Sequence, residues 1–145
     1  MKIPYELIEH TADIGIRVKG NNLEELFKNT ALAMFDIIAE RKSKSPDAGR
    51  QAQRITSHII KQEAETLEEL FINWLNELLS LSAAKSLIFS DFKINRLDDK
   101  NLEAVVSGEG SANFKFNTEI KAATYHQLKL EERDGVWTAE VIFDV

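Results

Sequence analysis

The segment NLEELFKNTALAMFDIIA, residues 22–39, decides the fold, because its pattern predicts a long amphipathic helix. Its apolar residues recur every three or four positions and therefore fall on one stripe of a helix. They are Leu23, Leu26, Phe27, Ala31, Met34, Phe35 and Ile38. Asn22 is a favourable N-cap, and Glu25 stands three residues later, where a capping box places its acidic partner. This helix needs an apolar surface to cover.

A second segment, TLEELFINWLNELLSL at residues 66–81, repeats the arrangement. Thr66 takes the N-cap position and Glu69 follows three residues later. Its apolar residues again form one stripe. They are Leu67, Leu70, Phe71, Trp74, Leu75, Leu78 and Leu79. We therefore expect two helices with similar caps and one buried face each.

Most of the remaining chain alternates apolar and polar residues, which predicts β-strands. Short strands are expected on either side of a polar gap, at Leu7 and at residues 14–18. Further strands are expected in residues 54–64, 86–97, 101–110, 119–126 and 128–145. Asp134-Gly135 is a favoured two-residue hairpin turn within the last of these segments. Residues 40–50 carry turn residues and mixed charge, which predicts a surface loop.

Strands that alternate with helices early and follow one another late are typical of an α+β domain. We predict a single domain over residues 1–145, with a mainly antiparallel sheet and the two helices packed on one face. A chain of 145 residues has room for one sizeable core.

Composition and charge narrow the function classes. The chain contains no cysteine, which excludes disulfides, thiolate metal sites and cysteine nucleophiles. No apolar run approaches the roughly 18 residues that a bilayer requires, and the pattern of a signal peptide is missing, so a cytoplasmic protein is expected. The net charge of −6 favours a protein partner or a cation over a bare polynucleotide.

Common catalytic signatures are missing from the sequence: there is no phosphate-binding loop, no His-Glu-x-x-His pair and no Gly-x-Ser-x-Gly elbow. Polar residues gather instead at the ends of expected strands. The groups are His10, Thr11 and Asp13; Lys121, Thr124, Tyr125 and His126; and Asp144 beside Val145. The Asp144 side chain and the terminal carboxylate of Val145 would repel each other unless a positive charge lay nearby.

Each of these residues also has a purely structural explanation. A histidine at a strand end is commonly a hydrogen-bonded structural residue. Asp13 fits an Asx turn, and Lys121 and Tyr125 fit the surface of a sheet. The residues alone therefore leave the function open between a binding site and an ordinary fold.

Longer motifs resemble those of the archease family. They are EHTADIGI at residues 9–16, NLEELF at the start of the first helix, KAATYH at residues 121–126, and a final Phe-Asp-Val. They occur in the family's order and span nearly the whole chain. The resemblance implies a protein cofactor that activates an RtcB-type RNA ligase in tRNA splicing and RNA repair. Such a cofactor promotes guanylylation of the ligase and multiple turnover, and is not itself an enzyme.

The resemblance also implies a divalent-cation site, with calcium as the expected ion, on Asp13 and Asp144, and with a main-chain or terminal oxygen of Val145. A functional lysine of the family falls on Lys121. Calcium prefers oxygen ligands, so His10 is expected beside the ligands and not among them. Tyr125 and His126 join Lys121 and His10 as candidates for contact with the ligase. Direct RNA binding is not expected outside the ligase complex, and no membrane partner is expected.

Two other classes of function stay open. Asp13 and Asp144 would also suit a metal-dependent hydrolase, in which the ion activates water. A general chaperone or binding module is compatible with a small acidic domain. An assay of the purified protein alone and with a splicing ligase separates these classes, since a cofactor shows activity only in the mixture.

Overall fold

The computed structural model describes residues 4–8, 13–42 and 54–145. Within these residues, helix α1 spans Leu23–Ile38 and helix α2 spans Leu67–Lys85. The strands are β1 (Glu6–Ile8), β2 (Ile14–Gly20), β3 (Ala39–Arg41), β4 (Ile55–Glu63), β5 (Leu87–Leu97), β6 (Asn101–Gly110), β7 (Phe114–Phe116), β8 (Ala122–Arg133) and β9 (Val136–Asp144). A short 3₁₀ helix, Ser111–Asn113, precedes β7.

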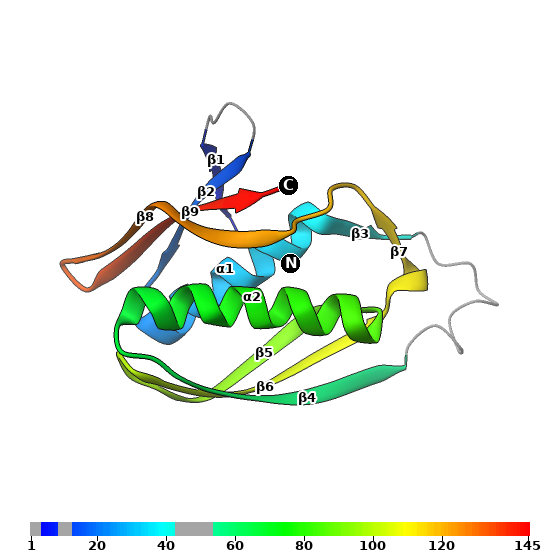
Figure 1. Cartoon of the computed structure of the whole chain (residues 1–145), viewed down its shortest axis with the longest axis horizontal. Coiled ribbons are helices and arrows are strands. Elements are labelled where there is room, and N and C mark those ends of the chain that lie inside the picture. The colour runs from blue at the N-terminus through cyan, green and yellow to red at the C-terminus, as the bar shows by residue number, and fades with distance from the viewer. Residues whose placement is uncertain (1–3, 9–12, 43–53) are drawn as a thin grey trace.

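The helices lie between two antiparallel sheets (Figure 1). In the described part of the chain, one sheet has the strand order β1-β2-β9-β8 and another has the order β4-β6-β5, while β3 and β7 form a separate pair. Helix α1 contacts β2 and β5, and α2 contacts β8 and β5, so both helices join the two sheets. The predicted α+β class with antiparallel strands and two helices is confirmed. The single expected sheet is divided, because alternation identifies strands without showing which strands pair.

Both helix starts have the predicted caps. The Asn22 side chain accepts a hydrogen bond from the Glu25 backbone N–H at 2.8 Å, and Thr66 accepts one from Glu69 at 3.1 Å. Each glutamate reaches back to the residue before the cap, not to the cap itself, with both N–H···O distances at 3.1 Å. The caps thus satisfy N–H groups that have no partner inside the helix.

Helix α2 continues four residues beyond the predicted end, to Lys85. Its last turns carry small and polar residues, which have no apolar periodicity to detect. Ser86 then takes a left-handed conformation, with φ of 53°, and its N–H donates to the Ser82 carbonyl. A left-handed residue of this kind is a common helix stop.

The core lies where the two helices cross between the sheets. Phe27 of α1 and Phe71 of α2 meet edge to face, with ring centroids 5.2 Å apart, and both are fully buried. The Trp74 indole N–H donates to the Phe27 carbonyl at 3.0 Å. Residues from both predicted apolar stripes therefore meet in the core between the sheets.

The β8–β9 hairpin turns at Asp134-Gly135, as predicted, and both residues have positive φ angles, 53° and 81°. The β5–β6 pair has a register shift between Phe89 and Asp91. Gly108 lies opposite this shift, and a Cβ atom there would overlap backbone atoms of β5. Glycine lets the two strands approach each other at this point.

The segment expected to be a surface loop begins instead as strand. Glu40 and Arg41 belong to β3, which pairs with β7, and residues 43–50 lie outside the described residues. The exposed charged residues of so short an edge strand hide its pattern. Arg41 pairs with the buried carboxylate of Glu109 and lies 5.0 Å above the ring of Phe114.

Neither described helix is long and apolar enough to cross a membrane.

Candidate metal and partner site

The register between β2 and β9 brings the start of β2 beside the end of β9. Ile14 pairs with Phe143, and the same register places Asp13 opposite Asp144, one step beyond the ladder. Val141 and Phe143 are fully buried against the helices, so the alternate positions, including Asp144, belong to the opposite face of the sheet. Asp13 is half-buried and Asp144 is exposed. Two carboxylates therefore occupy neighbouring strand ends.

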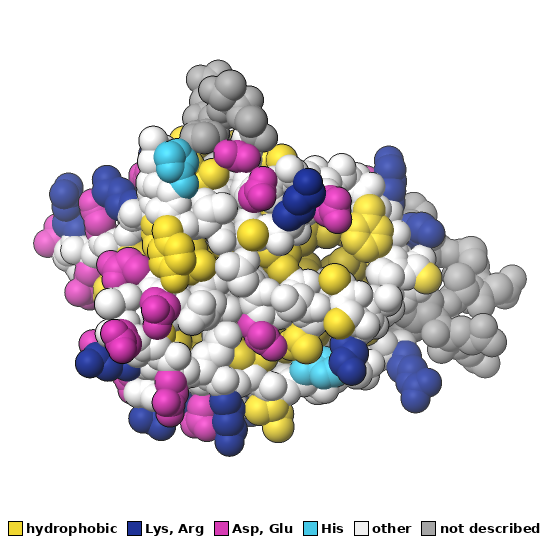
Figure 2. All heavy atoms as spheres, viewed as in Figure 1, with side chains coloured by type: hydrophobic (Ala, Val, Ile, Leu, Met, Phe, Trp, Pro, Cys, Tyr) yellow, Lys and Arg dark blue, Asp and Glu magenta, His cyan; other side chains and the backbone are white. Residues whose placement is uncertain are grey.

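Lys121 lies beside the same strand end. Its backbone N–H donates to the Asp144 carbonyl at 2.8 Å, and the next residue, Ala122, pairs with Asp144 in the β8–β9 ladder. The Lys121 side chain is exposed. Figure 2 shows acidic and basic side chains close together on the upper part of this face. Three adjacent strand ends thus gather two acidic residues and one basic residue.

Asn76 of α2 fixes the start of β8, and sequence reasoning missed it. Its side-chain amide donates to the Ala123 carbonyl at 3.1 Å and accepts from the Ala123 N–H at 2.8 Å. Because β8 is at the edge of its sheet, these bonds replace a neighbouring strand. No sequence motif distinguishes this asparagine from the other polar residues of the helix. Asn76 therefore anchors the strand that begins beside Lys121.

The other half of the KAATYH motif lies away from the two carboxylates. Strand β8 leaves its register after Thr124 and resumes it at Lys129, so four residues face a single residue of β9. Tyr125 and His126 lie in this bulge, and Gln127 has a φ of 51°. Tyr125 is 56% exposed, and burial of part of its ring, followed by the charge of Glu69, raises its pKa. The bulge presents this tyrosine near the first turn of α2.

The structure describes only part of the expected cation site. His10 and Thr11 lie outside the described residues. Across residues 4–8, 13–42 and 54–145, no group of three or more His, Cys, Asp or Glu side chains is arranged to hold a metal ion. The set expected from the motifs has two carboxylates, Asp13 and Asp144, and an oxygen of Val145. Its carboxylates are the hard oxygen donors that calcium takes, and the register brings them together.

Comparison with known proteins gives the family. A model of the Archease protein family matches residues 5–145. The chain belongs to the archease family. The protein archease of Methanosarcina acetivorans is 37% identical over 147 residues, which cover 97% of this chain and 95% of the relative. The protein archease of Pyrococcus furiosus is 37% identical over 149 residues, with 97% of this chain and 98% of the relative covered.

Two solved archease-like structures share the fold. The solution structure of Methanobacterium thermoautotrophicum protein 1598 matches with a TM-score of 0.71 and 30% identity, over 97% of this chain and 98% of the other. A crystal structure from Thermotoga maritima, described as an archease and possible chaperone, matches with a TM-score of 0.64 and 28% identity. That match covers 100% of this chain and 98% of the other. The motif-based assignment to the archease family is confirmed.

Proposed function

We propose that this archease is a protein cofactor that activates an RtcB-type RNA ligase in tRNA splicing and RNA repair. In this proposal it promotes guanylylation and multiple turnover of the ligase and performs no catalysis of its own. Family membership supports the proposal, and the sequence carries none of the common nucleotide-binding or nucleophile motifs.

The register that places Asp13 opposite Asp144 carries the proposal. Two carboxylates on adjacent strand ends repel each other, and a divalent cation held between them offsets that repulsion. Asp13 and Asp144 would hold calcium together with an oxygen of Val145. Because calcium takes six to eight oxygen ligands, positions remain for water or for oxygen atoms of the ligase. The ion would supply positive charge at a surface that a partner can reach.

Lys121 has a separate role in the proposal. Its exposed ammonium, next to Asp144 along the sheet edge, would attract the phosphates of the guanylate or a carboxylate of the ligase. A planar guanidinium has a different geometry, so Lys121→Arg should restore only part of the stimulation that Lys121→Ala removes. Stimulation by Lys121→Ala equal to that of the wild type would contradict this role.

The direct test measures transfer of labelled guanylate from GTP to a matched RtcB-type ligase, with and without this protein. We expect faster labelling and repeated turnover in the mixture, and no ligation by this protein alone. Equal labelling in both reactions would overturn the proposal. Protection of unrelated unfolded proteins, without any effect on the ligase, would instead support a general chaperone.

Calcium titration by calorimetry tests the cation site independently of the ligase. Asp13→Asn and Asp144→Asn should each weaken calcium binding, because each removes a charged ligand. Asp91→Asn is the matched control, since Asp91 is exposed on β5 in the other sheet. Ligand binding stabilises the folded state by mass action, so calcium should raise the melting temperature of the wild type and the control alone. Equal affinity in all four proteins would place the ion elsewhere.

A further inference from the structure

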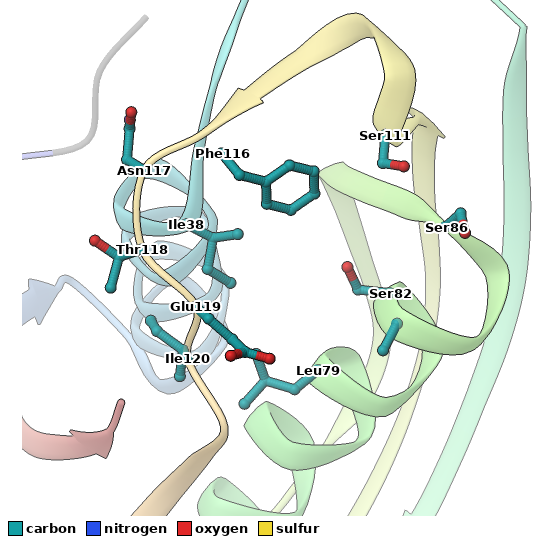
Figure 3. Close-up of a pocket in the computed structure, with 11 residues that line it drawn as sticks. Ile38, Leu79, Ser82, Ser86, Ser111, Phe116, Asn117, Thr118, Glu119 and Ile120 are labelled. Carbon is teal, nitrogen blue, oxygen red and sulfur yellow. The ribbon is translucent and has the colours of Figure 1, made fainter.

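A hollow lies between the last turns of α2 and the segment that joins β7 to β8. Its volume is about 500 Å³, within the range of sites that hold a drug-sized ligand. Figure 3 shows Ile38, Leu79 and Phe116 around a shared space, with Ile120 at its lower end. The Phe116 side chain is 56% exposed, although most phenylalanines of this chain are buried. The structure thus leaves an apolar hollow with an aromatic ring at its rim.

The hollow also has one acidic side chain in its lining. Glu119 is the charged residue of its lining, and Figure 3 shows its side chain crossing toward α2 beside Leu79, while Asn117 and Thr118 point away. The carbonyl end of α2 borders the same space, and its partial negative charge is offset in part by Lys85 in the last turn. An exposed phenylalanine ring attracts cations through its face. Apolar walls, one carboxylate and one aromatic face together suit a lysine or arginine side chain with an apolar neighbour.

The hollow adjoins the candidate cation site. Glu119 precedes Lys121 by two residues, and the Lys121 N–H is bonded to Asp144. Both features therefore lie along one continuous edge formed by residues 116–122. Figure 2 shows the hollow on the same face as the cluster of acidic and basic side chains, with hydrophobic side chains at its floor. One partner surface can reach both.

We propose that this hollow, with Phe116 and Glu119 at its rim, docks a short segment of the ligase that carries one basic and one apolar side chain. This inference rests on the proposed function and names the surface that the ligase contacts. The apolar side chain and the aliphatic stem of the basic residue fill the hollow, while the positive charge meets Glu119 and the Phe116 ring. The hollow provides affinity for the ligase, and the neighbouring strand ends, with Asp13, Asp144 and Lys121, promote its guanylylation.

Two alanines at the end of α2 provide a matched test. Ala83 lines the hollow and Ala84 does not, and both are exposed. Phenylalanine at either site has the same cost in helix propensity, but only Ala83→Phe fills the hollow. We expect Ala83→Phe to raise the dissociation constant for a matched RtcB-type ligase by about tenfold or more, the effect of losing a central contact. Ala84→Phe should bind like the wild type, and both variants should keep the wild-type calcium affinity.

The charge at the rim has its own measurement. Glu119→Gln should weaken ligase binding and reduce the fall in affinity that added salt causes, because one attractive pair is lost. If the wild type stimulates the ligase while Ala83→Phe binds it equally well, the docking inference is wrong and the proposed function stands. If the wild type neither binds nor stimulates the ligase, the proposed function fails and the inference fails with it.

Discussion

Substituting Asn76 tests how firmly α2 holds the start of β8. Asn76→Ala removes both hydrogen bonds to Ala123, whose side chain and backbone are almost fully buried at 4% exposure. At about 1–1.5 kcal/mol for each bond, the loss is about 2–3 kcal/mol. Alanine returns about 0.5 kcal/mol through its better helix propensity. The expected net destabilisation is therefore about 1.5–2.5 kcal/mol.

Thermal unfolding followed by circular dichroism measures this change. An unfolding entropy of about 2.1 cal/mol/K per residue gives about 0.3 kcal/mol/K for 145 residues, so the melting temperature should fall by about 5–8 °C. Asn29→Ala is the control, because Asn29 also joins a helix to a strand but makes one exposed bond, to the Lys19 carbonyl at 2.9 Å. Its lost bond and its gained propensity nearly cancel. Equal melting temperatures for the two variants would refute the reasoning.

Three further predictions concern other parts of the molecule. Gly108→Ala should destabilise strongly and Gly110→Ala should not, because a Cβ overlaps β5 at the first position and meets nothing within 4 Å at the second; denaturant unfolding compares them. Gly135→Ala should cost about 1 kcal/mol in the same assay, because its φ of 81° is left-handed. Burial and a hydrogen bond to Asp36 raise the pKa of Tyr5 from 10.0 to about 12. The unfolded state therefore loses this proton first, so stability falls as pH rises through that interval. Tyr5→Phe should flatten the fall, and an unchanged pH profile would contradict the assignment.

Local sequence signals predicted the local structure. The stripe and cap of each helix depend on residues three or four positions apart, and the hairpin turn depends on two adjacent residues. The sequence therefore predicted the stripes, the caps and the turn. The end of α2 was missed because its last residues, which include Ala83 and Ala84, do not continue the apolar periodicity of the helix. The short β3–β7 pair and the division into sheets were missed because pairing depends on distant residues.

The sequence likewise predicted only part of the arrangement of the candidate site. Motifs pointed to Asp13, Asp144 and Lys121, and the register of β2, β9 and β8 brings these three residues to adjacent strand ends. The same motif placed Tyr125 with Lys121, but the bulge in β8 carries the tyrosine toward α2. A bulge of four residues against one has no clear local signature, although Gln127 must adopt a positive φ there. Cation binding and ligase contact stay predictions.

The pairing of β2 with β9 has a consequence for how the molecule forms. Ile14 and Phe143 are 129 positions apart, and β9 lies between β2 and β8 in the sheet. During synthesis β2 emerges early and has to wait for its central neighbour, and contacts of such long sequence separation slow folding. The two carboxylates come together only when that last strand inserts. A half-made or misfolded molecule therefore lacks the paired strand ends, and a partner that recognises them would select finished molecules.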